Sequence, residues 1–463
     1  MNKTDVAKVK SKKSAYGVNI TNFSVLLIMA LLAAKAHLGI GILLAAIGSI
    51  AFIIFDKKDR LGLFIPNFIF LPIFILTLGS SEVGDGVSAS AIARGRVAIA
   101  SWIIAIVYLV FAMVYHLFTP RMKKKLIPPY FAGALSIVFA ALFMVGILVK
   151  FTYVPLDQGG VINYIGISNL VLFVFLFYLF NSLSKDSFFN RYKLPLIFIM
   201  GILIYVIHDL IMLATQASLE GTLYFARFQE FGHYNYFVFS NLGEYFRFYN
   251  HIDFDWSLIL LALALTVISF SNTVNMYRGE GEEVSKKLKE GPSLDSKILL
   301  DSGLTLANSA FAIPPFELIS EEVRYINKKE KIINTTFLMG IIILVFALPL
   351  EYILQTIPEG IYFAFLFLFA SRLFINGFNL IKAGVKEQGK LRTGVGVILI
   401  LLLGFILGGF FLAEIFLGYT LALSLTIGSV KINFFLIIIV ASFILNIVLP
   451  LPKQKGEDIL PHE

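Results

Sequence analysis

Two proline-broken apolar stretches decide how this sequence folds. They are Leu63–Pro72, LFIPNFIFLP, in the first half of the chain and Ala310–Ile319, AFAIPPFELI, in the second half. A helix interrupted inside a bilayer is tolerated only where protein or a water-filled cavity covers the freed backbone groups. Paired breaks in corresponding halves are the best sequence-level indication of the binding site of a secondary transporter. The two stretches therefore predict a permease.

The composition places the chain in a bilayer. Hydrophobic residues make up 58% of the 463 residues and charged residues only 15%, whereas a soluble domain carries roughly 25% charged residues. Apolar runs recur along the chain, many of them near the ~20 residues that a spanning helix needs, and about fourteen spans are expected. The expected fold class is an all-α polytopic membrane protein with broken third and tenth spans. The expected spans are 20–38, 39–55, 61–79, 96–118, 127–150, 163–183, 194–215, 256–276, 296–311, 314–326, 332–354, 360–382, 393–416 and 431–449.

The basic residues give the expected orientation. With the N-terminus inside, most of the 38 Lys and Arg residues fall in cytoplasmic segments, as the positive-inside rule requires. We therefore expect a multi-pass protein of the plasma membrane with both termini in the cytoplasm. The net charge of +8 is then a signal of topology, and no nucleic-acid partner is expected.

The sequence offers little for catalysis or metal binding. It contains no cysteine, and its six histidines lack the spacing of a metal site. It has no phosphate-binding loop and no nucleophile–base pattern. We expect no metal, no cofactor and no enzymatic activity.

The longest expected outer loop, 216–255, combines acidic residues with many aromatic ones. A segment at headgroup level, where aromatic rings are enriched, is the favoured explanation. A lid or a receptor surface is the alternative, and the sequence leaves it open.

Several further stretches follow one shared pattern, in order along most of the chain. They are Ile40–Phe55, Pro120–Tyr130 with Ala132–Ala134, Leu300–Leu306 followed by the Pro314–Pro315 break, Glu321 and Arg324, then Ile357–Pro358, and the Lys382–Arg392 loop. Together they resemble the nucleobase–cation symporters, the uracil and xanthine permeases. The chain is accordingly interpreted as a divergent member of that family.

The resemblance implies two inverted seven-helix repeats, in a fold shared with sulfate and bicarbonate transporters. It would place the start of the third-span half-helix against the start of the tenth, with substrate between them, and it implies a homodimer. Spans 1–4 and 8–11 would form a core domain, and spans 5–7 and 12–14 a gate domain. The implied boundaries are tail 1–19, core 20–126, gate 127–255, core 256–331 continuing to 354, gate 355–449 and tail 450–463.

The resemblance also selects residues near the two breaks. The tenth span of the family carries a carboxylate that binds the base ring, and Glu321 matches it with one gap, whereas Glu322 matches without a gap. Glu317 is four residues before Glu321 and shares its helix face. The other candidate substrate-binding residues at the breaks are Asn67, Phe68 and Phe316. Alternatively, Glu317, Glu321 and Arg324 lie at the cytoplasmic membrane surface and have no role in binding.

The eighth span departs from the family. Asn272 stands where the family has a second acid, and Ser271 and Asn275 lie beside it in the sequence. An asparagine can donate and accept hydrogen bonds but cannot titrate. The three residues are candidate substrate ligands, and interhelical hydrogen bonding is the alternative. The departure leaves both proton coupling and nucleobase specificity open.

Charges also fall inside two other spans. Asp209, next to His208, lies in the seventh span and Arg372 in the twelfth. Ionisable residues at such depth are costly, and each requires a partner. We predict that Asp209 pairs with Arg372, as a structural ion pair in preference to a proton relay.

These observations support a secondary active transporter that moves a nucleobase-like small solute by motion of the core against the gate. Its partners are a small-molecule substrate and the lipid bilayer, with a proton or sodium ion as the candidate coupling ion. A small-anion carrier of the same fold is the alternative. A membrane scaffold or receptor that kept the fold and lost transport is a third interpretation.

Overall fold

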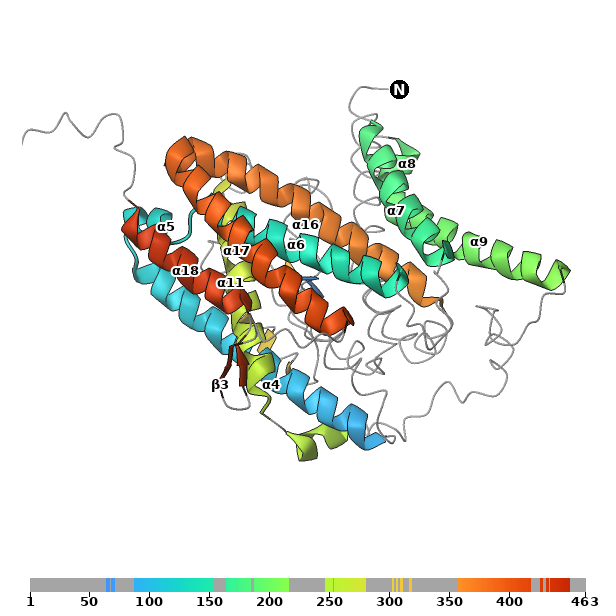
Figure 1. Ribbon diagram of the computed structural model, residues 1–463, viewed down its shortest axis with the longest axis horizontal. Coiled ribbons are helices and arrows are strands. Elements are labelled where there is room, and N and C mark those ends of the chain that lie inside the picture. Colours follow the sequence, from blue (N-terminus) through green and yellow to red (C-terminus); the bar gives the residue numbers. More distant parts are fainter. Residues whose placement is uncertain are drawn as a thin grey trace, which may run out of the picture. The chain divides into compact units, whose positions relative to one another are not determined.

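The computed structural model is largely helical in the residues that it describes (Figure 1). The residues that it describes, to which all structural statements below refer, are 64–66, 68–70, 87–152, 164–184, 187–215, 246–252, 254–279, 302–303, 305–306, 309–310, 316–318, 357–417, 425–427, 430–432 and 434–449.

Seven of the described helices are long and apolar enough to cross a membrane, and they coincide with seven expected spans. These helices are α4 (Val87–Leu117), α6 (Pro129–Thr152), α7 (Tyr164–Ser182), α9 (Lys193–Ala214), α11 (Trp256–Gly279), α16 (Glu359–Gln388) and α17 (Lys390–Leu417). The apolar helix α18 (Phe434–Val448) is shorter. The all-α polytopic class is confirmed, while the count of fourteen stays a prediction, because the other expected spans lie wholly or partly outside the described residues.

Short elements join or interrupt these helices. They are the helices α5 (Pro120–Leu126) and α8 (Phe188–Arg191), the 3₁₀ turns η1 (Phe68–Phe70) and η6 (Phe246–His251), and the strands β1 (Phe64–Pro66), β2 (Phe316–Leu318), β3 (Leu425–Ile427) and β4 (Val430–Ile432). Strand β4 pairs antiparallel with β3. The last expected span, 431–449, therefore begins too early, because its first two residues belong to β4 and not to α18.

The local sequence explains where several helices begin and end. Pro120 opens α5, and the Thr119 hydroxyl accepts a hydrogen bond from the Met122 N–H at 3.3 Å, a cap that satisfies one of the unpaired N–H groups of a first turn. Gly389 separates α16 from α17 with a φ of 83°. Because a side chain would strain that left-handed conformation, glycine is the residue that suits this helix end.

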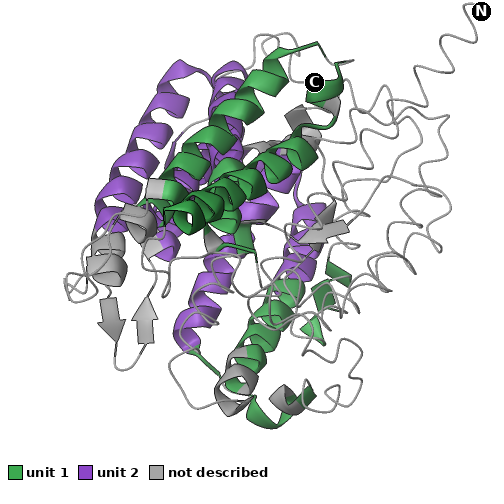
Figure 2. Cartoon of the chain, turned by 90° about the vertical axis from the view of Figure 1, so that its right-hand side faces the viewer, with its two compact units in different colours: residues 1–106, 147–255, 299–369 green, residues 107–146, 256–298, 370–463 purple. Residues whose placement is uncertain are grey.

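The chain divides into two compact units (Figure 2). Unit 1 comprises residues 1–106, 147–255 and 299–369, and unit 2 comprises residues 107–146, 256–298 and 370–463. The division into core and gate domains that the family resemblance implies stays a prediction.

In unit 2, close contacts at glycines bring α6 against α16 and α17. A Cβ atom on Gly133 of α6 would lie 2.5 Å from the Gly377 carbonyl oxygen of α16, and a Cβ atom on Gly377 would lie 2.7 Å from the Gly133 carbonyl oxygen. Gly404 and Gly408 of α17 make similarly close approaches to α6. Without a hydrophobic force between helices in lipid, this close packing of small residues is a main source of association.

In unit 1, helices α7 and α9 form a hairpin that packs on the first turns of α16. Phe173 of α7 contacts Phe365 of α16, with ring centroids 4.8 Å apart. A Cβ atom on Gly201 of α9 would lie 2.5 Å from the Phe173 ring. The opposite faces of α7 and α9 expose large apolar side chains, among them Val171, Phe175, Leu203 and Ile207. Such faces suit contact with lipid.

Candidate substrate site

The two proline-broken stretches meet in unit 1 as a pair of short antiparallel strands. Phe64 pairs with Leu318, Ile65 with Glu317 and Pro66 with Phe316. The expectation that the third and tenth broken spans lie against each other is confirmed for the backbone. The strand pairing itself was not expected.

The pairing has a physical reason. Backbone N–H and C=O groups freed by a break in a spanning helix have no water to bind and must be satisfied by protein. Two breaks that form a ladder satisfy each other. Just after β1, the 3₁₀ turn η1 buries the side chains of Ile69 and Phe70, which fixes the first break in the interior of unit 1.

Tyr249 contacts the chain just before the second break. Its hydroxyl donates a hydrogen bond to the Ala310 carbonyl oxygen, and its ring stacks on that of Phe246. Tyr249 belongs to the aromatic loop 216–255. One residue of that loop is therefore hydrogen-bonded to the backbone four residues before Pro314. This contact is compatible with both interpretations of the loop, a segment at headgroup level or a lid.

The polar residues in the second half of α11 are buried in unit 2. Ser269 and Ser271 are completely buried, and Asn272, Thr273 and Asn275 are nearly so. We call Ser271, Asn272 and Asn275 the α11 polar cluster. Burying amide and hydroxyl groups in a spanning helix is unfavourable unless each finds a partner, so the partners of these three residues decide what the cluster can do.

Each side chain of the α11 polar cluster has unused hydrogen-bonding capacity. The Ser136 hydroxyl of α6 donates to Asn272 Oδ1 at 2.9 Å, and Asn275 Nδ2 donates to the Ser271 carbonyl oxygen at 2.8 Å. Asn272 Nδ2, Asn275 Oδ1 and Ser271 Oγ have no hydrogen-bond partner within the described part of the chain. The cluster thus keeps one donor, one acceptor and one hydroxyl, which can serve as either.

Two residues around α11 were missed by the sequence analysis. The first is Ser136, the donor to Asn272 Oδ1. The second is Tyr108 of α4, which donates its hydroxyl hydrogen to Ser269 Oγ. The Tyr108 ring packs edge-on against the Phe270 ring, with ring centroids 6.1 Å apart. Ser136 was detectable in principle as the single polar residue of the apolar stretch Phe131–Val149. Tyr108 gave no signal, because aromatic residues are common in spanning helices.

A second buried polar cluster in unit 2 was also missed. Arg392 Nη1 donates to the Leu449 carbonyl oxygen at 2.6 Å, and Nη2 donates to the carbonyl oxygens of Asn446 at 2.9 Å and Lys125 at 3.4 Å. The Tyr130 hydroxyl donates to Asn446 Oδ1. We call Tyr130, Arg392 and Asn446 the helix-end cluster. It joins the ends of α5 and α18 to the starts of α6 and α17. The sequence analysis named Arg392 only as the end of the Lys382–Arg392 loop and gave it no structural role.

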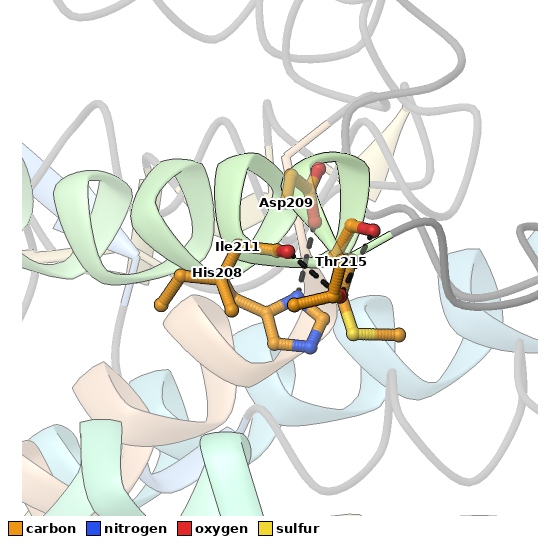
Figure 3. A network of polar contacts seen from close by, with 5 residues as sticks. His208, Asp209, Ile211 and Thr215 are labelled. Carbon is orange, nitrogen blue, oxygen red and sulfur yellow. Dashed lines mark hydrogen bonds and ion pairs between the residues drawn. The ribbon is translucent and has the colours of Figure 1, made fainter.

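Asp209 lies near the end of α9 in unit 1 (Figure 3). Its side chain is 10% exposed, and its Oδ1 atom lies 3.2 Å from Nδ1 of His208. Thr215 caps the helix one and a half turns later, donating its hydroxyl hydrogen to the Ile211 carbonyl oxygen at 2.9 Å. Arg372 is half-buried in the part of α16 that belongs to unit 2. The pairing of Asp209 with Arg372 therefore stays a prediction.

The remaining candidate residues are only partly located. Phe316 and Glu317 are placed by their backbone in β2, and Phe68 by its backbone in η1. The expectation that Glu317 shares a helix face with Glu321 is therefore wrong, because Glu317 belongs to a strand. Asn67, Glu321 and Glu322 lie outside the described residues. Within the described ranges, no group of three or more His, Asp or Glu side chains could hold a metal ion.

Comparison with known proteins identifies a family and a fold. A family model described as "Permease family", of the xanthine and uracil permease type, matches residues 20–409. The structure of SLC26A9 aligns with a TM-score of 0.57 at 9% identity, over 95% of this chain and 65% of that one. The murine Slc26a9 anion transporter, in an inward-facing state, aligns with a TM-score of 0.53 at 10% identity, over 89% of this chain and 68% of that one. No curated protein matches the chain by sequence.

At such low identity, the likeness to the SLC26A9 structures shows the fold alone. The chain spans only 65% of the length of the first of them. The family model covers most of the chain, and it confirms the resemblance that the sequence motifs carried.

Proposed function

The chain belongs to the permease family whose model matches residues 20–409, and from this premise we propose that it is a secondary active transporter of a nucleobase-like small solute. The family makes it a multi-pass membrane protein with a small-molecule substrate. The substrate class, the coupling ion and the transport motion are the parts that we propose.

The observation that carries the proposal is the unused hydrogen-bonding capacity of the α11 polar cluster. Asn275 Nδ2 faces a carbonyl oxygen, which only accepts, so the orientation of this amide is fixed and Oδ1 is left as an acceptor. Asn272 Nδ2 is left as a donor. A solute that satisfies both atoms must offer a donor and an acceptor. The adjacent N–H and C=O groups of a nucleobase ring are such a pair.

An inorganic anion without protons fits this cluster less well. It offers acceptors only, so Asn275 Oδ1 would stay unpaired. A buried polar atom without a partner costs about 1–3 kcal/mol. The cluster therefore favours a neutral solute with amide-like edges over a small anion.

The proposed coupling does not use α11. Asn272 cannot titrate, so a coupling proton would have to bind Glu321 or Glu322, and a sodium ion is the other candidate. We further propose movement of core against gate, a homodimer, residence in the plasma membrane and cytoplasmic termini. The positive-inside distribution of Lys and Arg supports this orientation.

A small-anion carrier is the second candidate function. It is favoured by the likeness of the fold to a murine anion transporter and by the absence of a titrating acid at Asn272. A scaffold or receptor without transport is the third.

Ligand-dependent thermal stability of the purified protein tests the proposal. A ligand that binds only the native state raises the melting temperature. Uracil, xanthine, sulfate and bicarbonate are compared in wild type, Asn275→Leu and Asn169→Leu. Asn169, completely buried in α7 of unit 1, is a matched control because both of its amide atoms lack a partner within the described ranges.

We expect a neutral base to raise the melting temperature of wild type and Asn169→Leu. In Asn275→Leu, its affinity should fall at least about tenfold, which corresponds to about 1.4 kcal/mol. Shifts with anions alone would favour the anion carrier. No shift with any of these ligands, in protein that melts cooperatively, would favour the scaffold.

A further inference from the structure

The last turns of α16 present one exposed face that changes from apolar to cationic. Ile375 and Phe378 are 43% and 46% exposed, and Lys382 and Lys386, farther along the helix, are exposed as well. With about 100° of rotation per residue, all four side chains fall within an arc of about 80° on the helix surface. We call these four residues the α16 outer face.

The opposite side of α16 is packed against α6 in unit 2. A Cβ atom on Gly377 would lie 2.7 Å from the Gly133 carbonyl oxygen, and one on Gly384 would lie 2.8 Å from the Tyr130 Cβ atom. By helical periodicity, Gly377 and Gly384 lie on the side of α16 that is turned away from the α16 outer face. The close contacts therefore hold the backbone of these turns in place, and the outer face points away from α6.

Helix α16 is longer than the hydrocarbon layer that it would cross. Its 30 residues correspond to about 45 Å at ~1.5 Å per residue, whereas the hydrocarbon core of a bilayer is about 30 Å thick. Lys382 lies about 33 Å along the axis from Gly360, where the candidate span begins. We therefore infer that Ile375 and Phe378 lie at the depth of the acyl chains, and that Lys382 and Lys386 lie among the headgroups.

The positive charge at this end of α16 is available to a ligand. Lys382 and Lys386 have no ion-pair or hydrogen-bond partner within the described part of the chain, and the same holds for Lys390, which is exposed at the start of α17. Glu387 is the only acid between Lys382 and Arg392. It is half-buried and lies about 100° around the helix from Lys386. The buried Arg392 donates to main-chain carbonyl oxygens and is not part of this face.

The proposed orientation puts this end of α16 on the cytoplasmic side, where the leaflet carries negative charge. We propose that the α16 outer face binds an anionic phospholipid. The acyl chains of the lipid pack on Ile375 and Phe378, and the ammonium groups of Lys382 and Lys386 contact the headgroup phosphate. An acidic soluble partner would use the lysines alone, whereas a phospholipid uses both halves of the face. This site goes beyond the proposed transport function and does not depend on the identity of the substrate.

Fluorescence quenching by brominated lipids in nanodiscs tests the proposal. The chain has two tryptophans, Trp102 and Trp256, and both are replaced by phenylalanine so that a single new indole is observed. Phe378→Trp puts that indole on the α16 outer face. Phe405→Trp in α17 is the matched control, because Phe405 is 45% exposed and the helical turns around it carry no lysine or arginine.

At equal bromine content, we expect brominated phosphatidylglycerol to quench the indole at position 378 about twofold more strongly than brominated phosphatidylcholine. The two lipids should quench the indole at position 405 equally. Lys382→Gln with Lys386→Gln should abolish the preference at position 378, whereas Lys382→Arg with Lys386→Arg should keep it. Equal quenching or no quenching at position 378, the same preference at position 405, or a preference that survives the glutamine changes would overturn the proposal.

A second measurement leaves the aromatic residues unchanged. Phosphatidylglycerol retained per protein through exchange into mixed micelles is counted for the full chain, for Lys382→Gln/Lys386→Gln and for Lys382→Arg/Lys386→Arg. Lower retention by the glutamine variant alone supports the site, and equal retention by all three proteins overturns it. Uptake of substrate is not part of either readout, so failure of this proposal is distinguishable from failure of the proposed function.

Discussion

The two buried polar clusters of unit 2 use their hydrogen-bonding groups differently. In the helix-end cluster, Arg392 donates to main-chain carbonyl oxygens at 2.6 and 2.9 Å and more weakly to a third at 3.4 Å. In the α11 polar cluster, a donor, an acceptor and a hydroxyl remain without partners among the described residues. Arg392 also leaves its Nε atom without one, but its terminal nitrogens are used. From this difference we infer that the first cluster holds helices together, and we propose that the second is available to a solute.

The largest effect is expected from breaking the helix-end cluster. Arg392→Leu would leave the carbonyl oxygens of Asn446 and Leu449 without their donor. Hydrogen bonds to charged groups contribute about 1.5–3 kcal/mol each, so a loss of about 3 kcal/mol or more is expected. The measurement is the free energy of unfolding in detergent. Arg392→Lys should recover only part of the lost free energy of unfolding, because one ammonium cannot reproduce the planar fork of a guanidinium.

The contrast between the two clusters would be wrong if Arg392→Leu had the same free energy of unfolding as wild type and a lower affinity for substrate. In that case the helix-end cluster, and not the α11 polar cluster, would be the binding site.

A smaller effect is expected where α6 crosses α16. In Gly377→Ala, the new methyl carbon would lie 2.7 Å from the Gly133 carbonyl oxygen. Overpacking of this kind costs about 1–3 kcal/mol. Gly409→Ala in α17 is the matched control, since a methyl group there meets nothing within 4 Å. The melting temperature should fall for the first variant and stay level or rise for the second. Equal behaviour of the two would show that the glycine contacts do not hold unit 2 together.

The smallest effect is expected at the edge of the α11 polar cluster. Ser136→Ala removes the donor to Asn272 Oδ1 and frees the amide to rotate. A single hydrogen bond contributes about 1 kcal/mol, so substrate affinity should fall about fivefold. The melting temperature without substrate should change by a few degrees at most. A large loss of stability with unchanged affinity would assign Ser136 and Asn272 to interhelical bonding, the alternative that the sequence left open.

The sequence predicted the spanning helices well, because length and hydropathy suffice for that purpose. Helix α9, for example, lies within one residue of its expected limits. The approach of the third and tenth breaks was also anticipated through the family resemblance. The strand pairing between Ile65 and Glu317 was not, since three-residue strands carry no periodicity that a pattern can detect.

Hydrogen-bond partners that are distant in the sequence were the main features that the sequence could not predict. Arg392 looks like any other basic residue of a cytoplasmic loop, yet folding buries it against the ends of two helices, α5 and α18. Asn272 was selected because of its place in the family pattern, but only the structure relates it to Ser136. The last span was misplaced at its start because Val430–Ile432, an apolar segment with one lysine, forms β4.

The most direct test of the central claim is uptake of radiolabelled uracil or xanthine into proteoliposomes, with and without sulfate or chloride inside. If the α11 polar cluster binds a neutral solute through paired donor and acceptor groups, uptake should be independent of the internal anion. It should also be reduced by Asn275→Leu and retained by Asn169→Leu. Uptake of sulfate that requires a counter-anion and is unaffected by Asn275→Leu, with no uptake of a base, would contradict the account.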